Sequence, residues 1–217
     1  MFRRWLPLLL IGALLLLSLG LRAYDNNRMM AAASALGPRA QANAGALQQL
    51  IAQGSRATDD SRVRATNQFF NDSVHYADDI EIWGVSDYWA SPLEMLAKGV
   101  GDCEDYSIGK YFALLSMGMP PSKLRMVFVR AMVDGLGSRG QAHMVVAFYP
   151  TPGAEPLILD NLVSEVLPAS RRPDLVPVYS FNSEGLWQGV GGQITGDPIS
   201  RLSKWRDVLA KARAEGF

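Results

Sequence analysis

The spacing of apolar residues changes once along this chain, from a helical repeat to an alternating one, and this change limits the possible folds. Residues 39–53 and 107–117 repeat apolar residues every three to four positions, which predicts amphipathic helices. Beyond Pro120 the period falls to two, as in residues 124–133 and 141–149. Helices followed by neighbouring strands predict an α+β fold, with helices packed on an antiparallel sheet.

Capping signals place further helices in the chain. Asp60 or Ser61 is a suitable N-cap for a second helix, and Ser91 with Glu94 has the pattern of a capping box. Asp197, which a proline follows, is expected to begin the last helix. The predicted strands therefore lie between helical segments in the sequence.

The strand region predicts a small sheet with a defined register. We expect a turn at residues 134–137, a hairpin loop at residues 150–156, and a third strand that ends at Asp160. Antiparallel pairing about the second loop sets Asp160 near residue 145 or 146. Asp160 is therefore expected to lie within a pleat or two of His143 on the neighbouring strand.

The first 23 residues differ in kind from the rest of the chain. Arg3 and Arg4 precede a long uncharged apolar run, which is typical of a signal peptide or an N-terminal membrane anchor. Residues 24–38 are rich in alanine and predict a tether. Residues 39–217 are then the expected folded domain, and either kind of leader indicates that this domain is exported.

The charge of the chain argues against a nucleic-acid partner. The sequence holds 21 Lys and Arg residues and 21 Asp and Glu residues. Without the three arginines of the leader, 18 basic residues stand against 21 acidic ones, a net charge of −3. A domain that binds nucleic acid would be expected to carry a basic excess.

The only cysteine of the chain, Cys103, lies between acidic residues at the predicted start of a helix. The unpaired N–H groups and the dipole of a helix N-terminus favour a thiolate at this position. Asp102 and Glu104 oppose the thiolate, unless a cation neutralises them. A single cysteine cannot form an internal disulfide, so in an exported protein it indicates a reactive or intermolecularly paired thiol.

A second acidic group, formed by Asp78, Asp79 and Glu81, precedes Trp83. Two interpretations of this group stay open. It is either a solvated loop or part of a cation site built from carboxylate oxygens.

Cys103, His143 and Asp160 have the residue types and the chain order of a nucleophilic triad. A thiol nucleophile needs a base within hydrogen-bond reach, and that base needs an orienting group. The chain has two histidines. His75 falls near the predicted end of a helix, where it can interact with the helix dipole. His143 is therefore the candidate base, and the order helix, strand, strand is one that a papain-like core can use.

Four motifs in order carry a family resemblance. They are Trp89–Glu94, Gly101–Asp105, Gln141–Val145 and Leu157–Asn161. Together they resemble the bacterial transglutaminase-like cysteine proteases and, among these, the LapG-type periplasmic proteases that control biofilm adhesins. The resemblance runs from about residue 40 to the C-terminus and implies a papain/transglutaminase-like fold, with the nucleophile on a helix N-terminus that packs on the sheet.

The resemblance also implies roles for the site residues and a biological setting. Cys103 would be the nucleophile, His143 the general base and Asp160 the residue that orients it, while Asp102 and Glu104 would bind Ca²⁺. The expected activity is calcium-dependent endopeptidase cleavage in the periplasm, in the N-terminal retention region of a large surface adhesin, which releases the adhesin and promotes biofilm dispersal. The expected inhibitory partner is a LapD-type inner-membrane receptor for cyclic-di-GMP.

Two alternative functions stay open. A transglutaminase-type acyl transferase would share the acyl-enzyme chemistry and differ only in using an amine acceptor. A non-catalytic, calcium-binding adaptor tethered to the membrane would not need the thiol at all.

Overall fold

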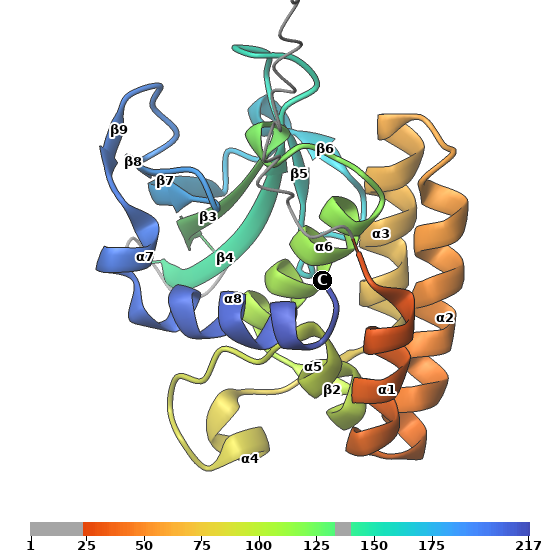
Figure 1. Cartoon of the computed structure of the whole chain (residues 1–217). Helices are drawn as coiled ribbons and strands as arrows, with labels where there is room; N and C mark the ends of the chain where they lie inside the picture. The colour runs from red at the N-terminus through yellow and green to blue at the C-terminus, as the bar shows by residue number, and fades with distance from the viewer. Residues whose placement is uncertain (1–23, 133–139) are drawn as a thin grey trace, which may run out of the picture.

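The computed structural model describes residues 24–132 and 140–217 and contains helices packed on an antiparallel sheet (Figure 1). The α+β prediction is therefore confirmed. The predicted leader, residues 1–23, and the predicted turn at residues 134–137 lie outside the described residues. Within the two described ranges, no helix combines the length and the apolar character that a membrane span requires.

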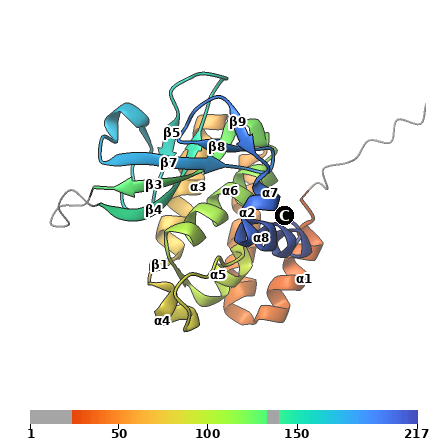
Figure 2. The same cartoon turned by 90° about the vertical axis from the view of Figure 1, so that its left-hand side faces the viewer.

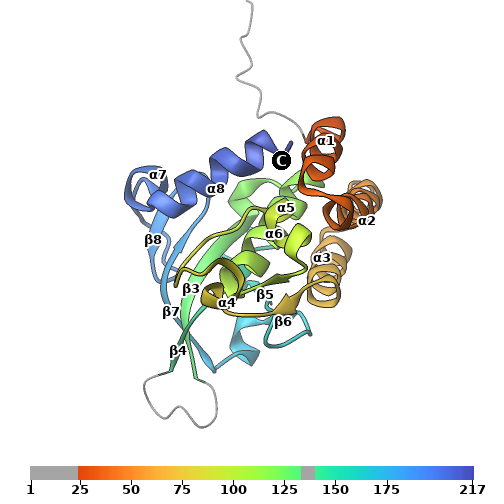
Figure 3. The same ribbon diagram turned by 90° about the horizontal axis from the view of Figure 1, so that it is seen from below.

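The helices form a row at one side, a central helix and a C-terminal group. Figure 3 shows α1, α2 and α3 in a row on one side of α6, with the sheet on its other side. The α-helices are α1 (Asn26–Leu36), α2 (Pro38–Gly54), α3 (Asp59–Ser73), α4 (Asp79–Trp83), α5 (Pro92–Lys98), α6 (Cys103–Ser116), α7 (Pro198–Arg201) and α8 (Ser203–Ala214).

The large sheet has the strand order β6-β5-β4-β3-β7-β8-β9, and every neighbouring pair in it is antiparallel. Figure 2 shows β3, β4 and β7 side by side. Two further short strands, β1 and β2, pair in parallel. The strands are β1 (His75–Tyr76), β2 (Val100–Gly101), β3 (Leu124–Ala131), β4 (Gln141–Phe148), β5 (Leu157–Leu159), β6 (Leu167–Pro168), β7 (Leu175–Phe181), β8 (Leu186–Gln188) and β9 (Ile194–Gly196). The three predicted strands are β3, β4 and β5.

Helix α6 is the centre of the fold. It is buried continuously from Asp105 to Leu114, because α3 and α5 cover it on one side and β4 and β3 on the other. Gly109 allows the close approach of the neighbouring helices, since a Cβ atom there would lie 2.6 Å from the Phe70 ring and 2.7 Å from the Met95 side chain. This packing fixes the rotation of α6 and therefore the direction in which Cys103 points.

The start of α3 differs from the prediction. Thr58 is the N-cap, and its hydroxyl oxygen accepts the backbone N–H of Ser61 at 3.3 Å. The prediction of Asp60 or Ser61 as the cap was wrong, because both lie inside the first turn, where Asp60 also faces the positive end of the helix dipole. His75 directly follows the C-cap of α3, near the helix end as predicted, and it is exposed on β1.

The caps predicted at Ser91 and Asp197 are confirmed, but the helix that follows Asp197 is shorter than expected. The capping box of Ser91 and Glu94 begins α5 with both of its hydrogen bonds present. The Asp197 side chain caps α7 as expected, but the predicted last helix is interrupted at Leu202, whose non-helical backbone separates α7 from α8. This break lets Trp205 on α8 point into the core, where it is fully buried.

Residues 24–38 are part of the folded domain and are not the predicted tether. Most of them form α1, which packs on α2 and α5 and buries Met29 and Ala33. The backbone N–H of Asp25 also donates to the carbonyl oxygen of Gly216 at 2.8 Å, so the segment is bound to the C-terminal end of the chain. The alanine-rich composition concealed this packing, because small side chains bury little area each.

Met29→Ala is expected to lower the free energy of unfolding by about 2–5 kcal/mol, because it leaves a cavity at a fully buried position. A denaturant titration measures this loss. Leu36→Ala on the same helix is the matched control, since Leu36 is 45% exposed, and it should cost less than about 1 kcal/mol. Equal, small losses of stability in both variants would instead support the prediction that residues 24–38 are a tether.

Candidate functional site

Cys103 is the first residue of α6, as the sequence predicts. Asp102 is the N-cap, and its carboxylate accepts the backbone N–H of Asp105 at 3.4 Å. The chain reaches this point from β2, which pairs with β1 and so fixes the direction of entry. The cysteine is therefore placed at the positive end of a rigid, buried helix.

The first two turns of α6 contact β4 at Met144, the residue after His143. The Ser107 hydroxyl donates to the Met144 carbonyl oxygen at 3.0 Å. The Met144 backbone N–H also lies near the Cys103 thiol and lowers its pKa. Strand β5 pairs with β4 only from Val146 to Phe148, so it has already left this edge at Met144. A strand residue presents its N–H and C=O to the same side, and here α6 occupies the side that β5 leaves open.

His143 and Asp160 form a buried pair beside this contact. His143 Nε2 lies 2.7 Å from Asp160 Oδ1, and the exposed fractions of their side chains are 4% and 0%. Leu159 pairs with Val146, so Asp160 follows β5 near residue 145, which confirms the predicted register. Because β5 stops pairing with β4 at Val146, this edge of β4 is free to contact α6. Asp160, the residue after β5, lies at the same place and contacts His143.

Asp160 is ionised in this environment. Burial raises its pKa, but the hydrogen bond and charge of His143, the Leu162 N–H and Arg172 outweigh burial and hold the pKa at about 2. An ionised carboxylate only accepts hydrogen bonds, so Nε2 of His143 is the donor. Its Nδ1 is then the unprotonated nitrogen of the neutral ring, which is the form a general base requires.

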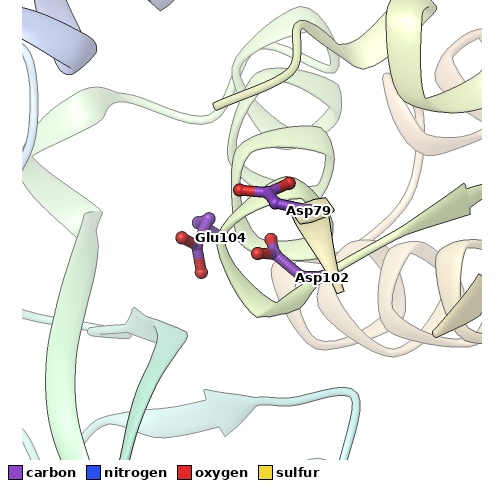
Figure 4. A group of neighbouring side chains, drawn as sticks. All are labelled: Asp79, Asp102 and Glu104. Carbon is purple, nitrogen blue, oxygen red and sulfur yellow. The ribbon is translucent and has the colours of Figure 1, made fainter. Parts of the chain in front are cut away.

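Three carboxylates meet beside the cysteine. One oxygen from each of Asp79, Asp102 and Glu104 lies within 4.8 Å of the others, and Figure 4 shows the three side chains turned toward a common space. Asp79 begins α4 and is 3% exposed, and Asp102 is 9% exposed. Asp79 had two open interpretations, and its position favours a cation site, whereas Asp78 and Glu81 are exposed as in a solvated loop.

The chemistry of this acidic cluster fits a divalent cation that prefers oxygen ligands. Burial, followed by the charges of Glu104, Asp105 and Asp79, raises the pKa of Asp102 to about 9. Oδ1 of Asp79 and Oδ2 of the neighbouring Asp105 are buried without a hydrogen-bond partner. Buried carboxylates that repel one another and lack donors are satisfied by a metal ion, and Ca²⁺ prefers such ligands.

The acidic cluster also acts on the nucleophile. The Cys103 thiol donates to Glu104 Oε2 at 2.9 Å. Burial, and then Glu104 and Asp102, raise the pKa of the Cys103 thiol, while the Met144 N–H lowers it. Without a cation, burial and the carboxylates together therefore outweigh the favourable position at the helix N-terminus, and the carboxylate part is the conflict that the sequence indicates.

Sequence reasoning did not assign Asp79 to the Asp102 and Glu104 site. The connection depends on the pairing of β1 with β2, since Tyr76 pairs with Gly101 and each strand leads within three residues to an acid of the cluster. Strands of two residues have no periodicity to detect, so the sequence offered only the local acidity as a signal.

The comparisons with known proteins identify a family and a fold. The sequence model of a family described as bacterial transglutaminase-like cysteine proteinase matches residues 41–192. Legionella pneumophila LapG is similar in structure, with 38% identity and a TM-score of 0.75 over 88% of this chain and 99% of that chain. No curated protein sequence matches the chain.

Two further structures of the same Legionella pneumophila protein are also similar. Its EGTA-treated form is 39% identical, with a TM-score of 0.76 over 88% of this chain and 99% of that one. Its calcium-bound form is 39% identical, with a TM-score of 0.74 over 86% and 98%. The predicted transglutaminase-like fold is therefore confirmed.

Proposed function

The chain belongs to the bacterial transglutaminase-like cysteine proteinase family, and we propose that it is a calcium-dependent endopeptidase of the periplasm that cleaves a large surface adhesin. The cut falls in the N-terminal retention region of the adhesin, which releases it and promotes biofilm dispersal. The likeness to LapG supports this substrate. A LapD-type inner-membrane receptor for cyclic-di-GMP is the proposed inhibitory partner.

One observation carries the enzymatic proposal. Helix α6, which begins at Cys103, contacts β4 through Ser107 at Met144, and the next residue of β4, His143, pairs with the buried Asp160. This arrangement supports a triad in which the thiol and the imidazole approach each other at one open strand edge. The residue types and their order along the chain support the same roles.

The proposed reaction uses each residue in a defined way. His143 Nδ1 takes the thiol proton, and the Cys103 sulfur forms a bond to the scissile carbonyl carbon. The same imidazole then protonates the leaving amine, and a water molecule hydrolyses the resulting thioester. Asp160 keeps Nε2 protonated and stabilises the positive charge of the ring during proton transfer.

Asp79, Asp102 and Glu104 are the proposed calcium ligands, and a calcium-bound form of the similar Legionella protein supports this proposal. Calcium held there would offset the negative charge that opposes the thiolate and would engage the Glu104 carboxylate that the thiol contacts. The chain itself supplies the nucleophile, the base and the orienting acid.

Incubating the purified protein with an adhesin N-terminal fragment and a labelled amine tests this function. With Ca²⁺ we expect two cleavage products without amine incorporation, and with excess EGTA we expect the rate to fall by about a hundredfold or more. Amine incorporation without cleavage would support the acyl-transferase alternative instead. Equal rates with Ca²⁺ and EGTA would contradict the role of calcium.

A further inference from the structure

Asp160 has a second buried partner besides His143. Arg172 follows the 3₁₀ turn Ala169–Arg171, and its Nη2 lies 2.7 Å from Asp160 Oδ2, with 3% of the arginine side chain exposed. The other carboxylate oxygen, Oδ1, accepts from His143 and from the Leu162 N–H at 3.0 Å. The imidazole and the guanidinium therefore use different oxygens of one carboxylate.

Arg172 is held in place by a third residue. Its Nε lies 3.0 Å from Asp174 Oδ1, and its Nη2 lies 2.7 Å from Asp174 Oδ2. The N–H groups of Arg172 are aligned for hydrogen bonds with Asp174 but not with Asp160. The contact between Arg172 and Asp160 is therefore a close ion pair. Asp174 thus orients the guanidinium, and the guanidinium presents its charge to Asp160.

We propose that Arg172 is a positioning residue of the proposed triad, which holds Asp160 in the orientation that faces His143 and limits how strongly Asp160 favours a charged imidazole. The proposal rests on the proposed function for its kinetic part. A carboxylate beside a histidine stabilises the imidazolium and raises its pKa. A guanidinium on the same carboxylate offsets part of that charge, so it weakens the stabilisation that Asp160 gives to a charged ring.

The other groups around the pair do not replace Arg172. Lys110 on α6 is fully buried, and its charge interacts with that of Asp160. Burial lowers the pKa of Lys110 to about 7, so the amine is charged only in part at neutral pH. The residue opposite His143 on β3 is Val129, which is apolar. Asp174 carries the opposite charge, and the guanidinium of Arg172 lies between it and Asp160.

The test compares Arg172→Met with the matched control Arg171→Met, since Arg171 is the exposed neighbour in the chain. In the cleavage assay we expect Arg172→Met to lower kcat by about tenfold to a hundredfold with KM changed less than about threefold. The control should keep both values. Arg172→Lys, which retains the charge, should recover part of the lost kcat.

A second readout needs no substrate. The chain has two histidines, so an NMR titration of the ring carbons resolves His143 against the exposed His75. We expect the pKa of His143 to rise by roughly half a unit to one unit in Arg172→Met, to rise less in Arg172→Lys, and to stay unchanged in Arg171→Met. Arg172→Gln keeps a polar side chain without the charge and provides the same comparison if the methionine variant does not fold.

An unchanged His143 pKa in a folded, uncharged Arg172 variant would overturn the proposal. A loss of kcat that Arg172→Lys does not recover, together with that unchanged pKa, would likewise assign Arg172 to the support of the fold alone. The NMR titration does not depend on cleavage. The role of Arg172 can therefore fail while the protease assignment stands, and the two failures are distinguishable.

Discussion

Cys103→Ala is expected to abolish cleavage of an adhesin N-terminal fragment, with kcat reduced by about 10⁴-fold or more. The reason is that Cys103 is the only thiol of the chain and lies at the N-terminus of the central helix, whose Ser107 contacts β4 at the residue next to His143. An alanine there leaves no atom that can form the acyl-enzyme bond. Quantifying the cleavage products over time, with Ca²⁺ present, measures the effect.

The control for this substitution is Ser116→Ala, at the other end of the same helix. Its hydroxyl donates to the Phe112 carbonyl oxygen within α6 and has no contact with the site. Both variants should unfold at nearly the parent temperature, because neither removes a large buried side chain. A Cys103→Ala variant that cleaves at the parent rate would contradict the assignment of Cys103 as the nucleophile, whereas a parent protein that binds calcium but does not cleave would favour the adaptor.

Asp102→Asn and Asp79→Asn are expected to weaken calcium binding by at least about tenfold each, because each removes one of the two buried carboxylates of the three-residue acidic cluster. Titration calorimetry on metal-stripped protein measures the affinity, and the calcium concentration needed for half-maximal cleavage should rise in parallel. Asp78→Asn, which changes an exposed acid next to Asp79, is the matched control and should bind calcium normally.

Asp102→Asn, which weakens calcium binding, is expected to stabilise the metal-free protein. The pKa of Asp102 is raised from 3.8 to about 9 by burial and by neighbouring carboxylates. A carboxyl whose pKa is higher in the folded state opposes folding as the pH rises, so metal-free protein should lose stability between about pH 4 and pH 9. Asp102→Asn should reduce this loss and melt at a higher temperature than the parent at pH 8 in EGTA. Calcium affinity equal to that of the parent would remove Asp102 from the proposed site, and no gain in metal-free stability would contradict its raised pKa.

The parts of the site that lie on regular elements could be predicted from the sequence. The period of two in β4 and β5, with one hairpin loop between them, placed Asp160 near residue 145 or 146, and the observed pairing of Val146 with Leu159 agrees. The start of α6 at Cys103 also followed from local signals. In both cases the information lies within about twenty residues of the chain.

The parts that depend on distant segments could not be predicted. Helix α1 gains its stability from contacts with α2 and α5, and the residue before it, Asp25, is bonded to Gly216, but its own alanine-rich sequence indicates none of these contacts. Asp79 joins Asp102 only through a two-residue parallel pairing. Arg172 reaches Asp160 from a short 3₁₀ turn that has no periodic pattern. Each of these contacts joins segments whose pairing no local pattern encodes.

The most direct test of the central claim is the rate at which iodoacetamide alkylates Cys103 in the parent protein and in His143→Gln. The single thiol makes intact-mass measurement unambiguous. If the imidazole acts on the sulfur, calcium-loaded parent protein at pH 7 should react at least about tenfold faster than calcium-loaded His143→Gln, and EGTA should slow the parent as well. Equal alkylation rates of the two calcium-loaded proteins would contradict the claim that Cys103 and His143 work together.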